Sequence, residues 1–210
     1  MMQMDEKIYC HRCGRKLIEK IPEGEDRERM FCDSCNAPVY ENPIPATAVV
    51  VTNEKSEILL VQRNVEPAKD HWCLPGGFLE VDETAEQGCL RELKEETGLE
   101  GDVEDLISNE ISDSPFYRSV VVLGYRVTNP RGTLAAGDDC KDARFFDNRH
   151  LPPVAFRSHR AILSKALNIP ESPFSVSEVV KAQRLKDFGN FGAYVITSAD
   201  HLKIAREACK

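Results

Sequence analysis

The chain has 210 residues, of which 41% are hydrophobic and 30% are charged, and its formal net charge is −8. This composition suits one packed domain with a small additional module, and no apolar run is long enough to cross a membrane. The acidic balance argues against broad nucleic-acid binding, and an N-terminus without a basic or apolar leader predicts a cytoplasmic protein. A polyanionic substrate would therefore need local cations or a bound metal.

The first motif along the chain is a pair of cysteine knuckles, which contain Cys10 and Cys13, then Cys32 and Cys35. Tetrahedral Zn²⁺ binds four thiolates and each knuckle presents two, so the spacing predicts a structural zinc ribbon over residues 1–41. A redox pair or disulfides are the alternatives, and both are disfavoured in a reducing compartment. His11 is an alternative ligand within the first knuckle. The ribbon is too short to bury a core, so the metal must supply its folding free energy.

Apolar and β-branched runs predict the strands of a second domain, residues 42–169. We expect strands at 47–52, 57–62, 76–81, 103–111, 117–127 and 143–147, the first two forming a hairpin, and helices at 84–97 and 154–167. Strands and helices mixed in this order predict an α+β fold with a mixed sheet between helices. Residues 170–210 are expected to form an α-rich extension, for which dimerisation, a lid and simple packing all remain open.

The expected helix at 84–97 carries the chemistry. Its acidic residues Glu92, Glu95 and Glu96 are spaced i, i+3 and i+4, which places their carboxylates on one turn. Stacked carboxylates repel one another unless cations neutralise them, and Mg²⁺ (or Mn²⁺) prefers such oxygen ligands. The pattern predicts a divalent-metal site, with a solvated acidic helix face as the alternative.

The segment from 77 to 99 contains a longer spaced pattern, made of Gly77, Glu83, Arg91-Glu92-Leu93, Glu95-Glu96 and Gly98-Leu99. It resembles the signature of the Nudix hydrolases, which cleave a nucleoside diphosphate linked to another group. The resemblance implies a Nudix-type α/β/α sandwich after the ribbon, and Mg²⁺ held by the three glutamates beside the Gly77 carbonyl. It also implies that Glu83 supports this cluster. Arg91 lies one residue before Glu92 and four before Glu95, so it can orient a carboxylate or partly offset the charge. A late-loop carboxylate often assists in the family, and Asp139, then Asp142, are the candidates.

Motifs outside the signature resemble a zinc-ribbon Nudix subgroup whose plant relatives hydrolyse FAD and ADP-ribose. NADH pyrophosphatases share this organisation, but the stretch at 112–119 lacks the tryptophan and two of the prolines in their downstream motif. Substrate contacts are expected from Arg63 and Arg118 to phosphates, and from Phe78 and Phe116 to an aromatic base. The alternatives are solvated arginines and aromatic side chains packed in the core.

The chain is therefore expected to be a Mg²⁺-dependent pyrophosphatase that releases AMP and X-phosphate, and to be a homodimer. Which carboxylate acts as general base stays open. One rival is another Nudix substrate, such as NADH, a nucleoside triphosphate or a capped RNA end. Another is an ADP-ribose-sensing regulator; sensors of that kind commonly lose signature glutamates, and here all are present.

Overall fold

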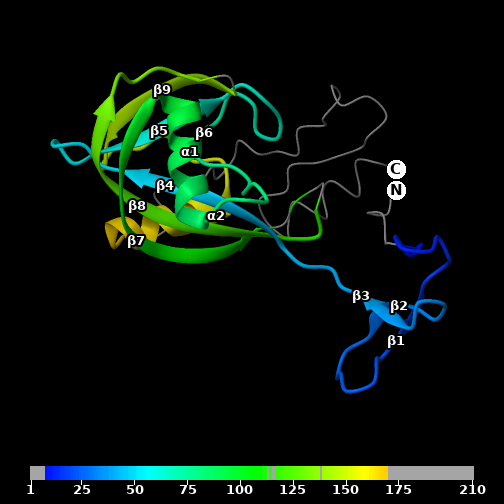
Figure 1. Cartoon of the computed structure of the whole chain (residues 1–210). Helices are drawn as coiled ribbons and strands as arrows, with labels where there is room; N and C mark the ends of the chain where they lie inside the picture. The colour runs from blue at the N-terminus through cyan, green and yellow to red at the C-terminus, as the bar shows by residue number, and fades with distance from the viewer. Residues whose placement is uncertain (1–7, 113, 115–116, 138, 170–210) are drawn as a thin grey trace, which may run out of the picture.

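The computed structural model describes residues 8–169, except 113, 115, 116 and 138. It has a small three-stranded module, followed by a larger body of strands and helices (Figure 1). The elements expected in 170–210 and the side chain of Phe116 lie outside the described residues. Among the described helices, none has the length and apolar character needed to span a membrane.

The N-terminal module is an antiparallel sheet of β1 (Ile18–Lys20), β2 (Arg29–Cys32) and β3 (Ala37–Val39), with β2 in the middle. These short strands were not among the sequence expectations. The buried residues of its core are Cys10, Leu17, Cys32 and Val39. Because half of this core consists of cysteines from the two knuckles, apolar burial alone contributes little to its stability.

One sheet of the larger body contains β4 (Ile44–Val51), β8 (Val120–Gly132) and β7 (Leu99–Ser112), in that order. β4 runs parallel to β8, whereas β7 is antiparallel to β8. The sheet is therefore mixed, as expected.

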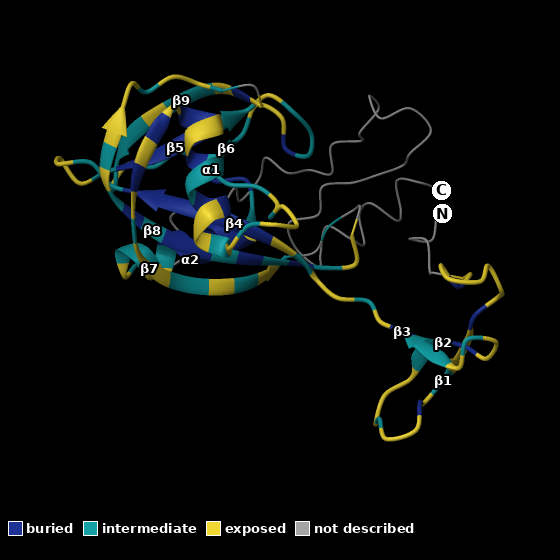
Figure 2. Cartoon of the chain, viewed as in Figure 1, coloured by how far each residue is buried: buried dark blue, intermediate teal, exposed yellow. Residues whose placement is uncertain are grey.

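The second sheet places β5 (Glu57–Arg63) between β6 (Trp72–Cys73) and β9 (Cys140–Asp147), and both pairings are antiparallel. The body also contains two helices, α1 (Ala85–Thr97) and α2 (Arg157–Leu167). Figure 2 shows that β4 is dark blue along most of its length, which means that it is buried.

β4 divides the core into two layers because successive side chains of a strand point to opposite faces. Ala48 and Val50 belong to one buried cluster, which includes Ile162 and Leu163 of α2. Val49 and Val51 belong to the other, which includes Cys89 and Leu93 of α1. The strand is thus covered on both faces, and the predicted α/β/α sandwich is confirmed.

The expected hairpin around Asn53 is wrong as a pairing of two strands. A turn does connect β4 to β5, but the two strands form no ladder with each other. The pairing at this turn is the isolated bridge between Thr52, just after β4, and Ile58. Each strand forms its full ladder with a partner distant in sequence, β8 for β4 and β9 for β5. Local turn residues do not reveal such long-range pairings.

The strand expected at 76–81 is also wrong, because this segment is a loop that follows β6 and lies beside β4. It forms one isolated bridge, between Ala46 and Phe78. Gly76 has a φ of +149°, which is a conformation that favours glycine. The second helix begins at Arg157 rather than 154, since Val154 bridges to Trp72.

His159 on α2 provides a test of this packing. It is buried, and its Nδ1 accepts a hydrogen bond of 3.1 Å from the Leu74 N–H. Burial lowers its pKa to about 3. The folded protein therefore binds fewer protons than the unfolded chain between about pH 6.5 and pH 3, so stability falls as the pH falls through this window.

We expect His159→Gln to reduce this loss of stability, because glutamine keeps an acceptor for Leu74 but does not titrate. Relative to pH 7, wild type should lose about 3 kcal/mol more than the variant at pH 4. Urea unfolding at both pH values measures the difference. Equal losses in the two proteins would contradict the assignment of a buried neutral imidazole.

Candidate active site

Local sequence signals define α1. Thr84 is the N-cap: its hydroxyl accepts from the Gln87 N–H at 3.3 Å, while the Gln87 side chain accepts from the Thr84 N–H at 2.7 Å. Gly98 ends the helix with a φ of 71°. The capping box and the glycine stop predicted from the sequence are confirmed. Burial of Cys89 and Leu93 then turns the acidic face toward the loop after β6.

Arg91 hydrogen-bonds three carboxylates, those of Glu92 and Glu95 on this face and that of Glu83 just before the helix. Its Nη1 donates to Glu92 Oε1 at 2.8 Å and to Glu95 Oε2 at 3.0 Å, and its Nη2 donates to Glu83 Oε1 at 2.6 Å. Nη2 also donates to the Phe78 carbonyl at 3.0 Å, which ties the helix to the glycine-containing loop. Hydrogen bonding to Arg91 lowers the pKa of Glu83 to about 2. Glu83 is therefore ionised at neutral pH.

Glu96 differs from Glu95 because it is buried, at 9% exposure. Its Oε2 accepts a hydrogen bond of 2.9 Å from the Gly76 N–H. Burial raises the pKa of Glu96 to about 7, and burial also raises the pKa of Glu92. A nearby divalent cation would stabilise the charged form of both groups.

Gly77 lies directly against Glu92. A Cβ on Gly77 would come within 2.4 Å of Glu92 Oε1, so a larger residue here would displace the Glu92 carboxylate. The site thus offers carboxylate oxygens beside a backbone turn, a donor set that suits Mg²⁺ or Mn²⁺. The structure does not bring the three glutamates into one cage, because Glu92 and Glu95 face Arg91 while Glu96 faces Gly76.

The four cysteines of the ribbon do form a compact group. Their Sγ atoms all lie within 4.8 Å of one another, with separations of 3.5 Å for Cys13–Cys32 and 4.0 Å for Cys10–Cys35. Tetrahedral zinc with Zn–S distances of about 2.3 Å places its sulfur ligands about 3.8 Å apart. The four residues therefore fit a structural zinc ion, whereas His11 is exposed and outside the group.

Asp139 lies on a loop that packs against the end of α1. In this loop the Gly137 N–H donates to the Glu96 carbonyl at 2.9 Å, and the Asp139 carbonyl accepts from the Asn64 N–H at 2.8 Å. Asp139 itself is exposed. Asp142 forms an ion pair with Arg144. Because this loop is bonded to the backbone of Glu96, Asp139 stays the first candidate for the late-loop carboxylate, and its role stays a prediction.

Arg63 and Phe78, two predicted substrate contacts, have different surroundings. The Arg63 Nε donates to the Pro67 carbonyl at 2.7 Å, and its guanidinium lies 5.3 Å from the centre of the Phe156 ring. Phe78 is 47% exposed and packs edge-on against Tyr117 at 5.3 Å between ring centres. Arg63 thus braces its own loop, while Phe78 leaves an aromatic surface open.

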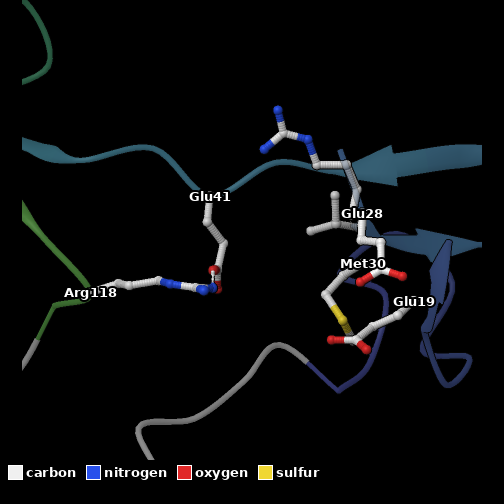
Figure 3. Close-up of a pocket in the computed structure, with 7 residues that line it drawn as sticks. Glu19, Glu28, Met30, Glu41 and Arg118 are labelled. Carbon is white, nitrogen blue, oxygen red and sulfur yellow. Dashed lines mark hydrogen bonds and ion pairs between the residues drawn. The ribbon is translucent and has the colours of Figure 1, made fainter. Parts of the chain in front are cut away.

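Arg118, the other predicted phosphate contact, forms an ion pair with Glu41 (Figure 3). Both residues line a pocket of about 310 Å³ between the ribbon and the larger body, together with Glu19, Glu28, Arg29, Met30 and Val39. The structure therefore places Arg118 beside the ribbon rather than among the carboxylates of α1.

Comparison with known families decides the identity of this fold and site. Residues 42–166 match the model of the NUDIX domain, and residues 9–41 match the model of the Nudix N-terminal zinc ribbon. The chain belongs to the Nudix family. Nudix enzymes use divalent metals, and this chain is a Nudix pyrophosphohydrolase, as expected.

Individual Nudix relatives agree with this assignment. The chain is 42% identical over 150 residues to an ADP-ribose pyrophosphatase of Methanocaldococcus jannaschii, covering 71% of this chain and 84% of the relative. It is 28% identical over 148 residues to the NAD-capped RNA hydrolase NudC of Pseudomonas aeruginosa, covering 70% of this chain and half of that enzyme. The crystal structure of a NUDIX hydrolase from Nitrosomonas europaea has a TM-score of 0.62 and 28% identity, covering 77% of this chain and 94% of that one.

Proposed function

We propose that this Nudix enzyme hydrolyses the diphosphate of ADP-ribose or FAD, releasing AMP and the phosphorylated second moiety. The observation that carries the proposal is the acidic face of α1 held against the Gly76–Gly77 turn by Arg91. This face supplies oxygen ligands where a diphosphate could share a metal. The similarity to an ADP-ribose pyrophosphatase along 84% of its length favours ADP-ribose among the substrates.

In this proposal Glu92, Glu95 and Glu96 bind Mg²⁺ or Mn²⁺, and the Gly77 carbonyl is a further ligand. The bound cation supplies charge stabilisation for the diphosphate and activates the attacking water. Arg91 orients Glu92 and Glu95 and keeps Glu83 ionised. One of the three glutamates or Asp139 accepts the proton from water.

Phe78 and Tyr117 provide a surface for the base. They are 47% and 40% exposed, and the Phe78 carbonyl is bonded to Arg91, so this aromatic pair lies close to the carboxylates. An adenine or flavin ring can stack on such a surface. We propose Phe116 and Arg63 as further contacts, and Arg118 as a phosphate contact once it leaves Glu41.

We also propose three segments: a ribbon at 1–41, a Nudix domain at 42–169 and an extension at 170–210. The active form would be a cytoplasmic homodimer that acts on small nucleotides rather than on nucleic acid.

The test compares phosphate-containing products released from ADP-ribose, FAD, NADH and a nucleoside triphosphate by wild type and Glu95→Gln. Glu95 is an exposed residue of α1, so its replacement should leave the fold intact. We expect turnover of ADP-ribose or FAD with Mg²⁺, and a fall of at least about 100-fold in the variant, since a metal ligand contributes several kcal/mol to the transition state.

A matched control is Glu100→Gln, which removes another exposed carboxylate near the end of α1 that pairs only with Lys94 among the described contacts. It should retain full turnover. Preference for NADH would instead support the rival interpretation as an NADH pyrophosphatase. Binding of ADP-ribose without any hydrolysis would contradict the hydrolase and support the ADP-ribose-sensing regulator.

A further inference from the structure

The Thr47 side chain on β4 is a buried polar group without an obvious structural purpose. Thr47 is 2% exposed, and within the described part of the chain its Oγ1 is the buried side-chain polar atom that has no hydrogen-bond partner. Leaving a buried hydroxyl unpaired costs about 1–3 kcal/mol. Valine has the same shape without this cost, and the next residues on the same face, Val49 and Val51, are valines.

Strand geometry places Thr47 on the face of β4 that is covered by α1. Residues two positions apart in a strand share a face, and Val49 packs in the cluster that contains Cys89 and Leu93 of α1. The partner of Thr47 across the ladder is Leu123 of β8, which packs against the same cluster. The hydroxyl therefore lies on the side of the carboxylates rather than on the side of α2.

Thr47 is also directly attached to the glycine turn. Its N–H donates to the Gly77 carbonyl at 2.8 Å, and its own carbonyl is so close to Gly76 that a Cβ there would lie 2.1 Å from it. Gly77 in turn touches Glu92, since a Cβ on Gly77 would meet the Glu92 carboxylate at 2.4 Å. In space, Thr47 of β4 thus lies next to Gly77, and Gly77 lies next to Glu92 of α1.

The Thr47 N–H already supports one of the proposed metal ligands. A carbonyl oxygen has two lone pairs, so the Gly77 carbonyl can accept from Thr47 and still face a cation. Groups that hydrogen-bond to metal ligands orient them and increase the affinity of the site. The hydroxyl of the same residue is suited to the same task.

We propose that the Thr47 hydroxyl is a positioning group for the divalent cation, and that it hydrogen-bonds an oxygen of the cation's coordination shell beside Gly77 and Glu92. This inference rests on the proposed function, because it assumes that the carboxylates of α1 bind the cation. The hydroxyl gains its partner only when the cation is bound. Thr47 therefore adds to metal affinity while it reduces the stability of the metal-free protein.

The test uses the full-length, zinc-loaded protein dialysed free of other divalent cations, with Mn²⁺ as the probe. Thr47→Val removes the hydroxyl and keeps the shape, whereas Thr47→Ser keeps the hydroxyl and removes the methyl group. Calorimetry measures the Kd for Mn²⁺, and thermal unfolding measures Tm with and without Mn²⁺. We expect Thr47→Val to weaken Mn²⁺ binding about tenfold, and Thr47→Ser to bind like wild type.

Without Mn²⁺, Thr47→Val should unfold at the wild-type Tm or above it, and with Mn²⁺ its rise in Tm should be smaller than that of wild type. An unchanged Kd in Thr47→Val would overturn the inference. Equal losses of Tm with and without Mn²⁺ would also overturn it, because they would indicate a purely structural role. Wild-type protein that binds no Mn²⁺ would overturn the proposed function itself, so the two failures are distinguishable.

Discussion

Glu96→Gln is expected to stabilise the metal-free enzyme and to reduce its activity strongly. Burial raises the pKa of Glu96 to about 7, so above that pH the folded protein contains a buried charge that the unfolded chain exposes to water. Glutamine removes the charge and keeps an oxygen that accepts from the Gly76 N–H. If Glu96 binds the cation, turnover of ADP-ribose should fall about 1,000-fold.

The stability gain should depend on pH in a defined way. Because the folded-state pKa lies above the usual value of 4.5, the folded wild type binds more protons between pH 4.5 and about 7, and it loses stability as the pH rises through this window. At pH 8 we expect Glu96→Gln to be more stable than wild type by about 3 kcal/mol, and at pH 4 the difference should vanish. Urea unfolding without Mg²⁺ measures both values. A pH-independent difference would contradict the burial of an ionisable Glu96.

Loss of one zinc ligand should unfold the ribbon and leave the Nudix core intact. Wild type is expected to contain one zinc per chain, and Cys32→Ser none. The ribbon core contains Cys10 and Cys32 themselves, and zinc binding contributes about 10 kcal/mol or more to modules of this kind. Elemental analysis measures the zinc, and hydrogen exchange compares protection in β1–β3 with protection in β4 and β5.

The control for this experiment is His11→Ala. His11 is exposed and lies in the first knuckle, so its replacement should retain both zinc and protection if the four cysteines are the ligands. A zinc-free His11→Ala would show that histidine replaces a cysteine. Full protection of β1–β3 in zinc-free Cys32→Ser would contradict a metal-dependent fold.

Features that depend on local spacing could be predicted from the sequence. The capping box at Thr84, the stop at Gly98 and the apolar stripe of α1 all involve residues within one or two helical turns. Each cysteine knuckle similarly places two thiols close together through a short turn. In both cases the pattern depends on residues that are close along the chain. The contact between the two knuckles, Cys10 with Cys35 and Cys13 with Cys32, in addition requires the ribbon to fold.

Features that depend on distant partners could not be predicted. The turn after Asn53 resembles that of a hairpin, yet β4 pairs with β8 and β5 with β9. Arg118 is a reasonable phosphate contact in isolation, but it pairs with Glu41 in the segment that joins the ribbon to the core. Side-chain partners across such separations follow from topology rather than from composition.

The sequence by itself determined the family, the cysteine ligands and the helix that presents three glutamates, because each follows from residue types at fixed local spacing. Only the tertiary structure decided how these glutamates differ. Glu95 is exposed, whereas Glu96 is buried against the Gly76 N–H, and Thr47 is enclosed on the same side of β4. Burial removes water from a group, and the atoms that replace the water come from strands and loops far away in the chain. The pKa of Glu96 and the unpaired hydroxyl of Thr47 are therefore properties of the fold, not of the motif.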